Sequence, residues 1–486
     1  MGLMDTIGNL IPQIKKPGKP LSFKDKLKWT TAIMIIYFAM FSTPALGVNI
    51  AILKQPVLQL INIIFAARTG TLITVGIGPI VLSSIVLQLI QGTGLIKIDL
   101  NDPQQKGKFQ SIQKMAAISI AIIESIIFTS TGYVPLANPG FFGIVVLQLT
   151  ISAIIVIYLD ETMVKYGLTS GINLFIAGGV AYSIIGGTVN ILAPEALAAL
   201  AAGGAGALPA AIEAFGPLFF AIIVMLISIY AYDMKVELPL AFSQLRGIGG
   251  RLPIPFLYVS VLPVILATSL IISMTVWFSF LAGAGGSFAN VAHFIAFYQK
   301  QSTGTGTSTT LVGGILYLIS PNFPLPYSAP YGIGGYGPYV SYLLTATSPL
   351  YMPWGGITYI PEWVHIITYT LMLVILCVIF GTFWIEMTGQ SPKHVSEQLQ
   401  SVGWQIPGFR RDPRVIESVL NKYIPTITVL GSIFVALLAA MATLTGAIGS
   451  GMGVLLTVGI MYMLYQQLER DRMLEGIPAL DSFLSN

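Results

Sequence analysis

The sequence predicts an all-α integral membrane protein with ten transmembrane helices, and three observations indicate this fold class. Only 9% of its 486 residues are charged and 55% are hydrophobic, whereas a soluble domain carries about 25% charged residues. Ten long apolar runs follow one another, most of them near 20 residues in length, which is enough to cross a hydrocarbon core of about 30 Å. Lysine and arginine gather in every second connection between these runs.

The chain begins with a polar segment, residues 1–28, which holds six lysines. Its apolar positions recur at helical spacing and predict a cytoplasmic amphipathic helix on the membrane surface. The predicted spans then occupy residues 29–47, 73–91, 112–131, 141–159, 172–192, 214–232, 256–282, 363–385, 424–447 and 452–466. After the first span, residues 56–67 are apolar but too short to cross, which favours a half-helix or re-entrant segment enclosed by protein or water.

The connection between the fifth and sixth spans lies at the midpoint of the chain. Residues 193–213 are rich in alanine and glycine, and they separate two sets of five spans. This position favours two pseudo-symmetric halves, 29–192 and 214–470, joined by an outer hinge, although no sequence repeat is visible. Three further connections are predicted as loops: a long outer loop at residues 284–360 and two cytoplasmic loops at residues 233–255 and 388–422. Residues 471–486 are predicted as a cytoplasmic tail.

The positive charges predict the orientation. The N-terminal segment, alternate connections and the tail hold 21 of the 24 lysines and arginines, while the opposite connections hold only Lys54, Arg68 and Lys300. Cytoplasmic loops carry such an excess, so both termini are expected in the cytoplasm.

The sequence lacks the common signatures of enzymes and cofactor sites. It contains no phosphate-binding G-x-x-x-x-G-K-[ST] loop, and its three histidines show no metal-ligand spacing. Its one cysteine, Cys377, lies in an apolar run and is interpreted as a packing residue. We therefore predict no enzyme activity, no cofactor and no metal site.

Few acidic residues interrupt the apolar runs. Glu124 in IAIIESIIF is the clearest case, and it is either a functional group or a hydrogen-bonded contact between helices. Asp160 and Glu161 fall at the end of a span and are interpreted as solvated charges. Secondary transporters usually place several charged groups near the midplane, so this scarcity favours a scaffold, a lipid-handling protein such as a scramblase or insertase, or a pore closed by apolar side chains. A secondary transporter with inverted repeats is the alternative.

Seven motifs occur in a fixed order along the chain. They are RTGTLITVGIGPIVLSSIVLQLIQGTG (Arg68–Gly94), YLDETMVKYGLTSGINLFIAGGV (Tyr158–Val180), VELPLAF (Val236–Phe242), LPVILATSL (Leu262–Leu270), FGTFWIEMTG (Phe380–Gly389), GFRRDPR (Gly408–Arg414) and GVLLTVGIMY (Gly453–Tyr462). In these motifs the chain resembles the archaeal SecY and eukaryotic translocon alpha-subunit family, over about residues 20–475 apart from the long outer loop. The resemblance implies a channel that translocates unfolded secretory polypeptides and releases hydrophobic segments laterally into the lipid.

The resemblance also implies a clam-shell of two five-helix halves around a central pore that narrows at a ring of apolar side chains. A narrow apolar ring excludes water and ions, yet it deforms around a passing chain. Carried over position by position, the ring consists of Ile77, Val81, Ile172, Ile176, Ile265 and Leu456.

Two further parts of the channel follow from the resemblance. The short segment 56–67 corresponds to a plug that blocks the outer funnel, with Pro56, Val57, Leu60, Ile61 and Ile64 as its apolar residues. A lateral gate is expected between the second and third helices on one side and the seventh and eighth on the other. Glu124 matches one member of its polar cluster. Ser273 stands at a second position in place of the more usual amide, and Leu82 at a third departs from the cluster.

The expected partners also come from the resemblance. Arg246, Arg251, Arg410 and Arg411 are expected to contact the ribosome, since arginine suits RNA phosphate groups. Signal sequences, nascent polypeptides, a small SecE/gamma-type membrane subunit and a SecBeta-type subunit complete the expected partners in the lipid bilayer. The archaeal-like motifs and the absence of an N-x-[ST] acceptor favour a plasma membrane over the endoplasmic reticulum.

Overall fold

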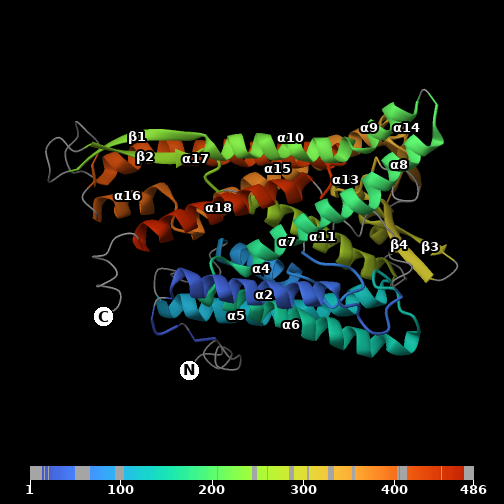
Figure 1. The fold of residues 1–486 in the computed structure, drawn as a ribbon, viewed down its shortest axis with the longest axis horizontal. Coiled ribbons are helices and arrows are strands. Elements are labelled where there is room, and N and C mark those ends of the chain that lie inside the picture. The colour runs from blue at the N-terminus through green and yellow to red at the C-terminus, as the bar shows by residue number, and fades with distance from the viewer. Residues whose placement is uncertain are drawn as a thin grey trace.

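The helices form two stacked layers, as the computed structural model of the chain shows in Figure 1. The first half contributes α2 (Phe23–Ser42), α4 (Gly78–Gly92), α5 (Pro103–Ser130), α6 (Phe142–Tyr166) and α7 (Gly171–Gly187). The second contributes α10 (Gly216–Asp233), α11 (Leu262–Gly283), α15 (Glu362–Met387), α17 (Pro413–Leu444) and α18 (Gly451–Glu475). The structure describes residues 14–15, 17–19, 21–49, 66–92, 103–204, 206–242, 249–259, 261–283, 289–303, 306–326, 333–352, 356–401, 404–405, 413–449 and 451–475.

Each predicted span overlaps one of these helices. Within the described ranges, seven helical segments are long and apolar enough to cross a membrane, and the apolar part of α4, Gly78–Leu87, is shorter. The all-α membrane fold is confirmed, while the count of ten spans stays a prediction. Exposed apolar side chains such as Leu147 (60%) and Leu226 (58%) cover the outside, as helices surrounded by lipid require.

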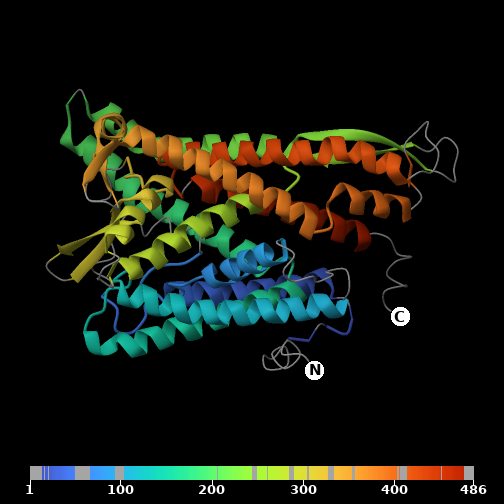
Figure 2. The same ribbon diagram turned by 180° about the vertical axis from the view of Figure 1, so that it is seen from behind.

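Two pairs of helices make the most extensive contacts between the two halves. Helix α4 packs against α11, and α7 packs against α18; the first of these contacts is visible from behind in Figure 2. One buried apolar cluster contains residues from both halves. Its aromatic centre in the first half is Tyr37 stacked on Phe175, with ring centroids 4.3 Å apart.

The predicted hinge, 193–213, is helical. A π-helical turn at Thr188–Leu192 connects α7 to α8 (Ala193–Ala202), and α9 (Ala207–Ala214) follows. Between α8 and α9 the chain turns at Gly203 and Gly204, both with positive φ (67° and 91°), a conformation that favours glycine. Whether this segment acts as a hinge stays a prediction.

Short strands, which the sequence analysis did not anticipate, lie in the connections. Strand β1 (Lys235–Phe242) pairs antiparallel with β2 (Gly249–Pro255) and with β7 (Trp404–Gln405). The two predicted cytoplasmic loops therefore meet in one sheet, near α16 (Pro392–Ser401). We call this end of the molecule, where α2 begins and α18 ends, the terminal end; it lies on the left in Figure 1.

The opposite end, which we call the loop end, carries the long connection predicted at 284–360. It contains α12 (Ala289–Ile295), β3 (Phe297–Thr303), β4 (Gly306–Gly313), α13 (Ile315–Ile319), α14 (Tyr336–Thr345), β5 (Thr347–Tyr351) and β6 (Ile357–Pro361). A buried polar network attaches it to α15. The Tyr317 hydroxyl donates to Glu362 at 2.9 Å, and the His365 ring nitrogens contact Glu362 at 3.0 Å and the Ser320 carbonyl at 2.9 Å.

Candidate pore and gate

Five of the six predicted ring residues lie on α4, α7, α11 and α18, and the sixth, Ile77, stands directly before α4. Ile77 directly precedes α4, and its carbonyl accepts the Val81 N–H at 3.1 Å. Ile172 is in the first turn of α7 and Ile176 in the second; because they are four residues apart, their side chains lie on the same face of the helix. Ile265 and Leu456 belong to α11 and α18.

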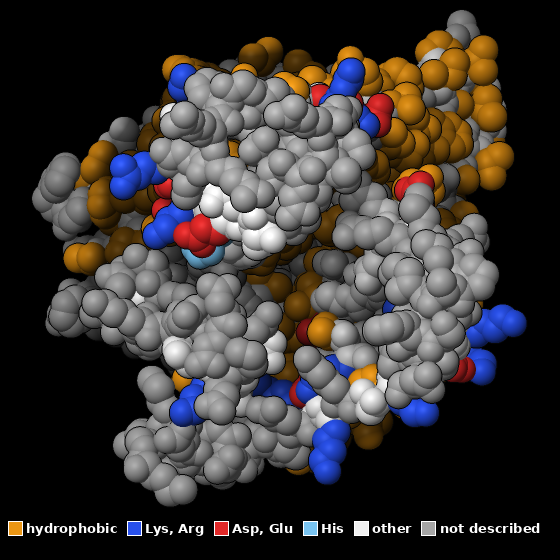
Figure 3. All heavy atoms as spheres, turned by 90° about the vertical axis from the view of Figure 1, so that its left-hand side faces the viewer, with side chains coloured by type: hydrophobic (Ala, Val, Ile, Leu, Met, Phe, Trp, Pro, Cys, Tyr) orange, Lys and Arg blue, Asp and Glu red, His pale blue; other side chains and the backbone are white. Residues whose placement is uncertain are grey.

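The ring residues are embedded in apolar surroundings. Five of them are between 0% and 5% exposed, and Ile172 is partly buried against the same apolar cluster. Figure 3, which looks onto the terminal end, shows lysine and arginine side chains near the rim and a hollow with hydrophobic side chains in its depth. Five of the six residues are thus buried in the apolar core that both halves share, and Ile172 packs against it; that the six form one ring stays a prediction.

The predicted plug residues, Pro56, Val57, Leu60, Ile61 and Ile64, lie outside the described residues. The chain that follows them is described from Ala66 onward and is attached to the first half. The Tyr37 hydroxyl donates to the Ala66 carbonyl, and Ala66 adopts a positive φ of 45°. A Cβ on Gly179 would stand 3.6 Å from the Ala66 Cα, so this segment packs on α7 three residues beyond Ile176.

Arg68 is held between two aromatic rings. Its guanidinium lies 5.4 Å from the ring centroid of Tyr182 on α7 and 5.9 Å from that of Phe41 on α2. A cation over the face of an aromatic ring is attracted by the ring quadrupole. The end of the predicted plug region is therefore fixed to α2 and α7 by both polar and aromatic contacts.

The two predicted gate residues are buried in helices that touch each other. Glu124 on α5 and Ser273 on α11 are each 2% exposed. Within the described part of the chain, Oε2 of Glu124 and Oγ of Ser273 have no hydrogen-bond partner. Leu82 is buried as well, and the polar link between α4 and α5 is instead a hydrogen bond from Gln113 to Ser84 at 2.6 Å.

Of the predicted docking arginines, Arg246, Arg410 and Arg411 lie outside the described residues. Arg251 is described, and its side chain is 77% exposed on β2. It donates to Glu237 on the paired strand β1 at 2.7 Å. This hydrogen bond and the positive charge of Arg251 hold the pKa of Glu237 below its usual value.

The interpretation of Asp160 and Glu161 as solvated charges is wrong, because both make specific contacts at the terminal end. Asp160 accepts hydrogen bonds from Ser170 and from the Ile172 N–H, at 3.1 and 3.0 Å. A cavity of about 180 Å³ lies beside them, lined by residues of α4, α5 and α6. The sequence reasoning missed these contacts because the partners of Asp160 lie beyond a turn.

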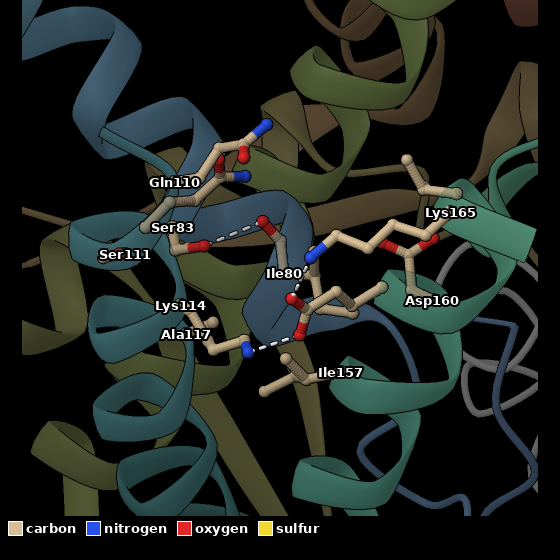
Figure 4. A pocket seen from close by; sticks show the side chains of 12 residues that line it. Ile80, Ser83, Gln110, Ser111, Lys114, Ala117, Ile157, Asp160 and Lys165 are labelled. Carbon is tan, nitrogen blue, oxygen red and sulfur yellow. Dashed lines mark hydrogen bonds and ion pairs between the residues drawn. The ribbon is translucent and has the colours of Figure 1, made fainter. Parts of the chain in front are cut away.

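Glu161 connects three segments at this cavity. It pairs with Lys114 of α5 and with Lys165 of its own helix, the latter at 2.8 Å, and it accepts the Ile14 N–H at 3.1 Å. In Figure 4, Lys114 and Lys165 point from opposite sides toward the same place in the cavity. Lys114 also lies over the ring of Tyr158, 4.3 Å from its centroid. The carboxylate of Glu161 thus joins the N-terminal segment, α5 and α6 through two ion pairs and a hydrogen bond.

Among the described residues, no group of three or more histidine, cysteine, aspartate or glutamate side chains is placed to hold a metal ion. Cys377 is buried in α15 and is a free thiol.

Comparisons with known proteins agree with this arrangement. The SecY family profile matches residues 71–465. The protein translocase subunit SecY of Methanococcus vannielii is 37% identical over 478 residues, which cover 98% of both chains.

Two solved structures have the same fold over nearly the whole chain. A structure of a protein-conducting channel has a TM-score of 0.77 at 34% identity, and it covers 97% of this chain and 98% of its own. Sec61 in the canine ribosome–channel complex from the endoplasmic reticulum has a TM-score of 0.74 at 34% identity, with 97% of each chain covered. The chain is a multi-pass membrane protein that belongs to the SecY family of protein-conducting channels.

Proposed function

We propose that the contact between the two halves is the translocation pore and that the six apolar residues form its seal. The observation that carries this proposal is that five of the six are buried, and that all six lie on or directly before α4, α7, α11 and α18, helices through which the two halves contact each other. Apolar side chains in a narrow passage expel water, and this blocks ions without a tightly binding site. The same side chains offer a polypeptide no strong partner, so it can slide past them.

Hydrophobic segments leave sideways through the seam between α4 and α5 on one side and α11 and α15 on the other. The unpartnered polar atoms of Glu124 and Ser273 support this assignment. A buried polar group without a partner favours separation of the helices, because water or a substrate can then satisfy it. Residues 56–67 act as the plug, and the contacts of Ala66 and Arg68 with α2 and α7 anchor its C-terminal end.

The chain is a passive channel without enzyme activity, and partners supply the driving force. Exposed Arg251 at the terminal end, together with Arg246, Arg410 and Arg411, docks the ribosome, as the likeness to Sec61 in a ribosome–channel complex supports. Small SecE/gamma-type and SecBeta-type subunits assemble with it. The terminal end faces the cytoplasm and the membrane is the plasma membrane, as the excess of lysine and arginine and the archaeal relatives support.

Crosslinking to a stalled nascent chain tests this function. A photoreactive group replaces Ile77 or Ile172 in membranes, and a ribosome carrying a half-made secretory protein is added. Adducts at both positions that require a signal sequence are expected. Leu147, 60% exposed on the outside of α6, is the matched control position. A photoreactive group there is expected to crosslink to lipid but not to the nascent polypeptide.

The control measurement is ribosome binding in the same membranes. Bound ribosomes without adducts at either ring position would contradict a pore at this place. The secondary-transporter alternative would then gain weight. This alternative has less support, because substrate sites of secondary transporters use charged groups at the membrane midplane. Few acidic residues interrupt the apolar runs of this chain.

A further inference from the structure

The helix that carries two of the six ring residues does not cap its own N-terminus. Ser170 stands at the N-cap position of α7, but its hydroxyl makes no hydrogen bond to the helix and donates to Asp160 of α6. The first N–H groups of any helix have no partner within the helix itself. The N-cap side chain of α7 therefore leaves these N–H groups open to an acceptor from another element.

Asp160 supplies this cap from the neighbouring helix. Its Oδ1 accepts the N–H of Ile172, the second residue of α7, at 3.0 Å. A carboxylate at this position satisfies an orphan donor and also interacts favourably with the positive end of the helix dipole. The residue whose N–H is held in this way is itself a ring residue.

A second observation shows how closely the two helices approach each other. A Cβ added to Gly171 would stand 2.8 Å from the Asp160 Cα and 3.0 Å from its Oδ1. Real Cβ atoms essentially never come within 3.0 Å of such an atom. Glycine at this position therefore allows the backbone of α6 to reach the start of α7, where the carboxylate makes its bonds.

We propose that Asp160 is a positioning residue for the pore seal: from α6 it holds the first turn of α7 and thereby fixes Ile172 in the ring. This inference rests on the proposed function of the ring. Ile172 is only partly buried, so packing alone holds it less firmly than Ile176, which is fully buried one turn further on. The neighbouring Glu161 ties the same part of α6 to α5 and to the N-terminal segment, which gives the cap a fixed support.

The test measures the first turn of α7 and the seal separately, in the full-length protein in lipid nanodiscs and planar bilayers. Asp160→Ala removes the acceptor. Hydrogen exchange of the Ile172 N–H should accelerate about 2- to 30-fold, the range expected for loss of an N-cap, while exchange of the Ile176 N–H stays unchanged. The ion conductance of the resting channel should rise severalfold.

Two variants distinguish the cap from a general effect on stability. Asp160→Asn keeps an oxygen that can accept the Ile172 N–H, so both exchange and conductance should stay close to native values. Ser170→Ala removes only the hydroxyl that donates to Asp160 and should likewise leave the Ile172 bond in place. If Asp160→Ala does not assemble, Asp160→Ser takes its place, because the serine side chain is too short to reach the Ile172 N–H.

Native exchange at Ile172 in the Ala or Ser variant would overturn the proposal, as would an Asn variant that leaks as much as the Ala variant. Faster exchange without a rise in conductance would show that Asp160 does not position the seal. The proposed function has a separate failure, namely the absence of nascent-chain adducts at Ile77 and Ile172 in the otherwise native protein.

Discussion

Glu161 and Glu124 belong to neighbouring helices of the same half, and their surroundings differ in kind. Glu161 is at the terminal end of α6, where two lysines and a backbone N–H converge on its oxygens. Glu124 is in the C-terminal half of α5, a helix that packs against α11, and its Oε2 has no partner among the described residues. The carboxyl group of Glu161 is bonded to partners within its own half. That of Glu124 has an oxygen without a partner, on a helix that touches the other half.

This difference indicates which contacts the molecule keeps and which it can give up. An ion pair with several hydrogen bonds resists separation, because removal of one partner leaves the others unpaired. A buried polar atom without a partner loses little when the two helices separate, since water replaces nothing that existed before. The first arrangement suits the interior of a half, and the second suits a seam that opens.

The largest expected effect comes from Glu161→Ala, which leaves Lys114 and Lys165 without their shared partner. Loss of one member of a fully buried pair costs about 3–5 kcal/mol, and since these side chains keep some contact with solvent we expect about 2–3 kcal/mol. Thermal unfolding in detergent measures it. Glu161→Gln is the matched control, because its amide oxygen still accepts the Ile14 N–H. Its stability should lie between that of the native protein and that of Glu161→Ala.

Glu124→Leu should have a smaller effect of the opposite sign. It removes an unpartnered polar atom from a buried site. We therefore expect the free energy of unfolding to stay unchanged or to increase by up to about 1–2 kcal/mol, with a corresponding rise in the unfolding temperature. The same unfolding assay measures it. A loss as large as that of Glu161→Ala would mean that Glu124 is bonded as firmly as Glu161, and the comparison between the two would fail.

The smallest effect concerns Glu237, a carboxyl group exposed on β1. Its pKa in the folded protein is lowered from the usual 4.5 because Arg251 donates a hydrogen bond to it and adds a positive charge. The contribution to stability is therefore present above pH 4.5 and is lost as the pH falls through the folded pKa. A ¹³C NMR titration of labelled glutamate should show this lowered midpoint, and Arg251→Ala should raise it toward the usual value, with the charge of Lys235 remaining.

Much of the fold could be predicted from the sequence, because long apolar runs have few alternatives in a membrane. All ten predicted runs overlap helices, and the ring positions, which came from the resemblance, lie on or directly before the helices α4, α7, α11 and α18. The strands in the loops were missed, since β1 is stabilised by pairing with β2 and β7, and β7 lies some 160 residues away in the sequence.

The role of Asp160 could not be predicted for a related reason. Its bonding to Ile172 depends on the path of the turn between α6 and α7, and a charge at the end of a span is usually solvated. The signal that could have indicated it is Gly171 directly after Ser170 at the start of an apolar run, a place where another backbone can approach.

The small sheet at the terminal end has a mechanical consequence. Strands β1 and β2 connect α10 to α11, and β7 lies between α15 and α17, so all three strands belong to the second half. A partner that binds this sheet therefore binds the second half of the channel and makes no contact with the first half through these strands. A force that such a partner applies to the sheet thus acts on the second half alone. It is transmitted to the first half through the contacts of α4 with α11 and of α7 with α18.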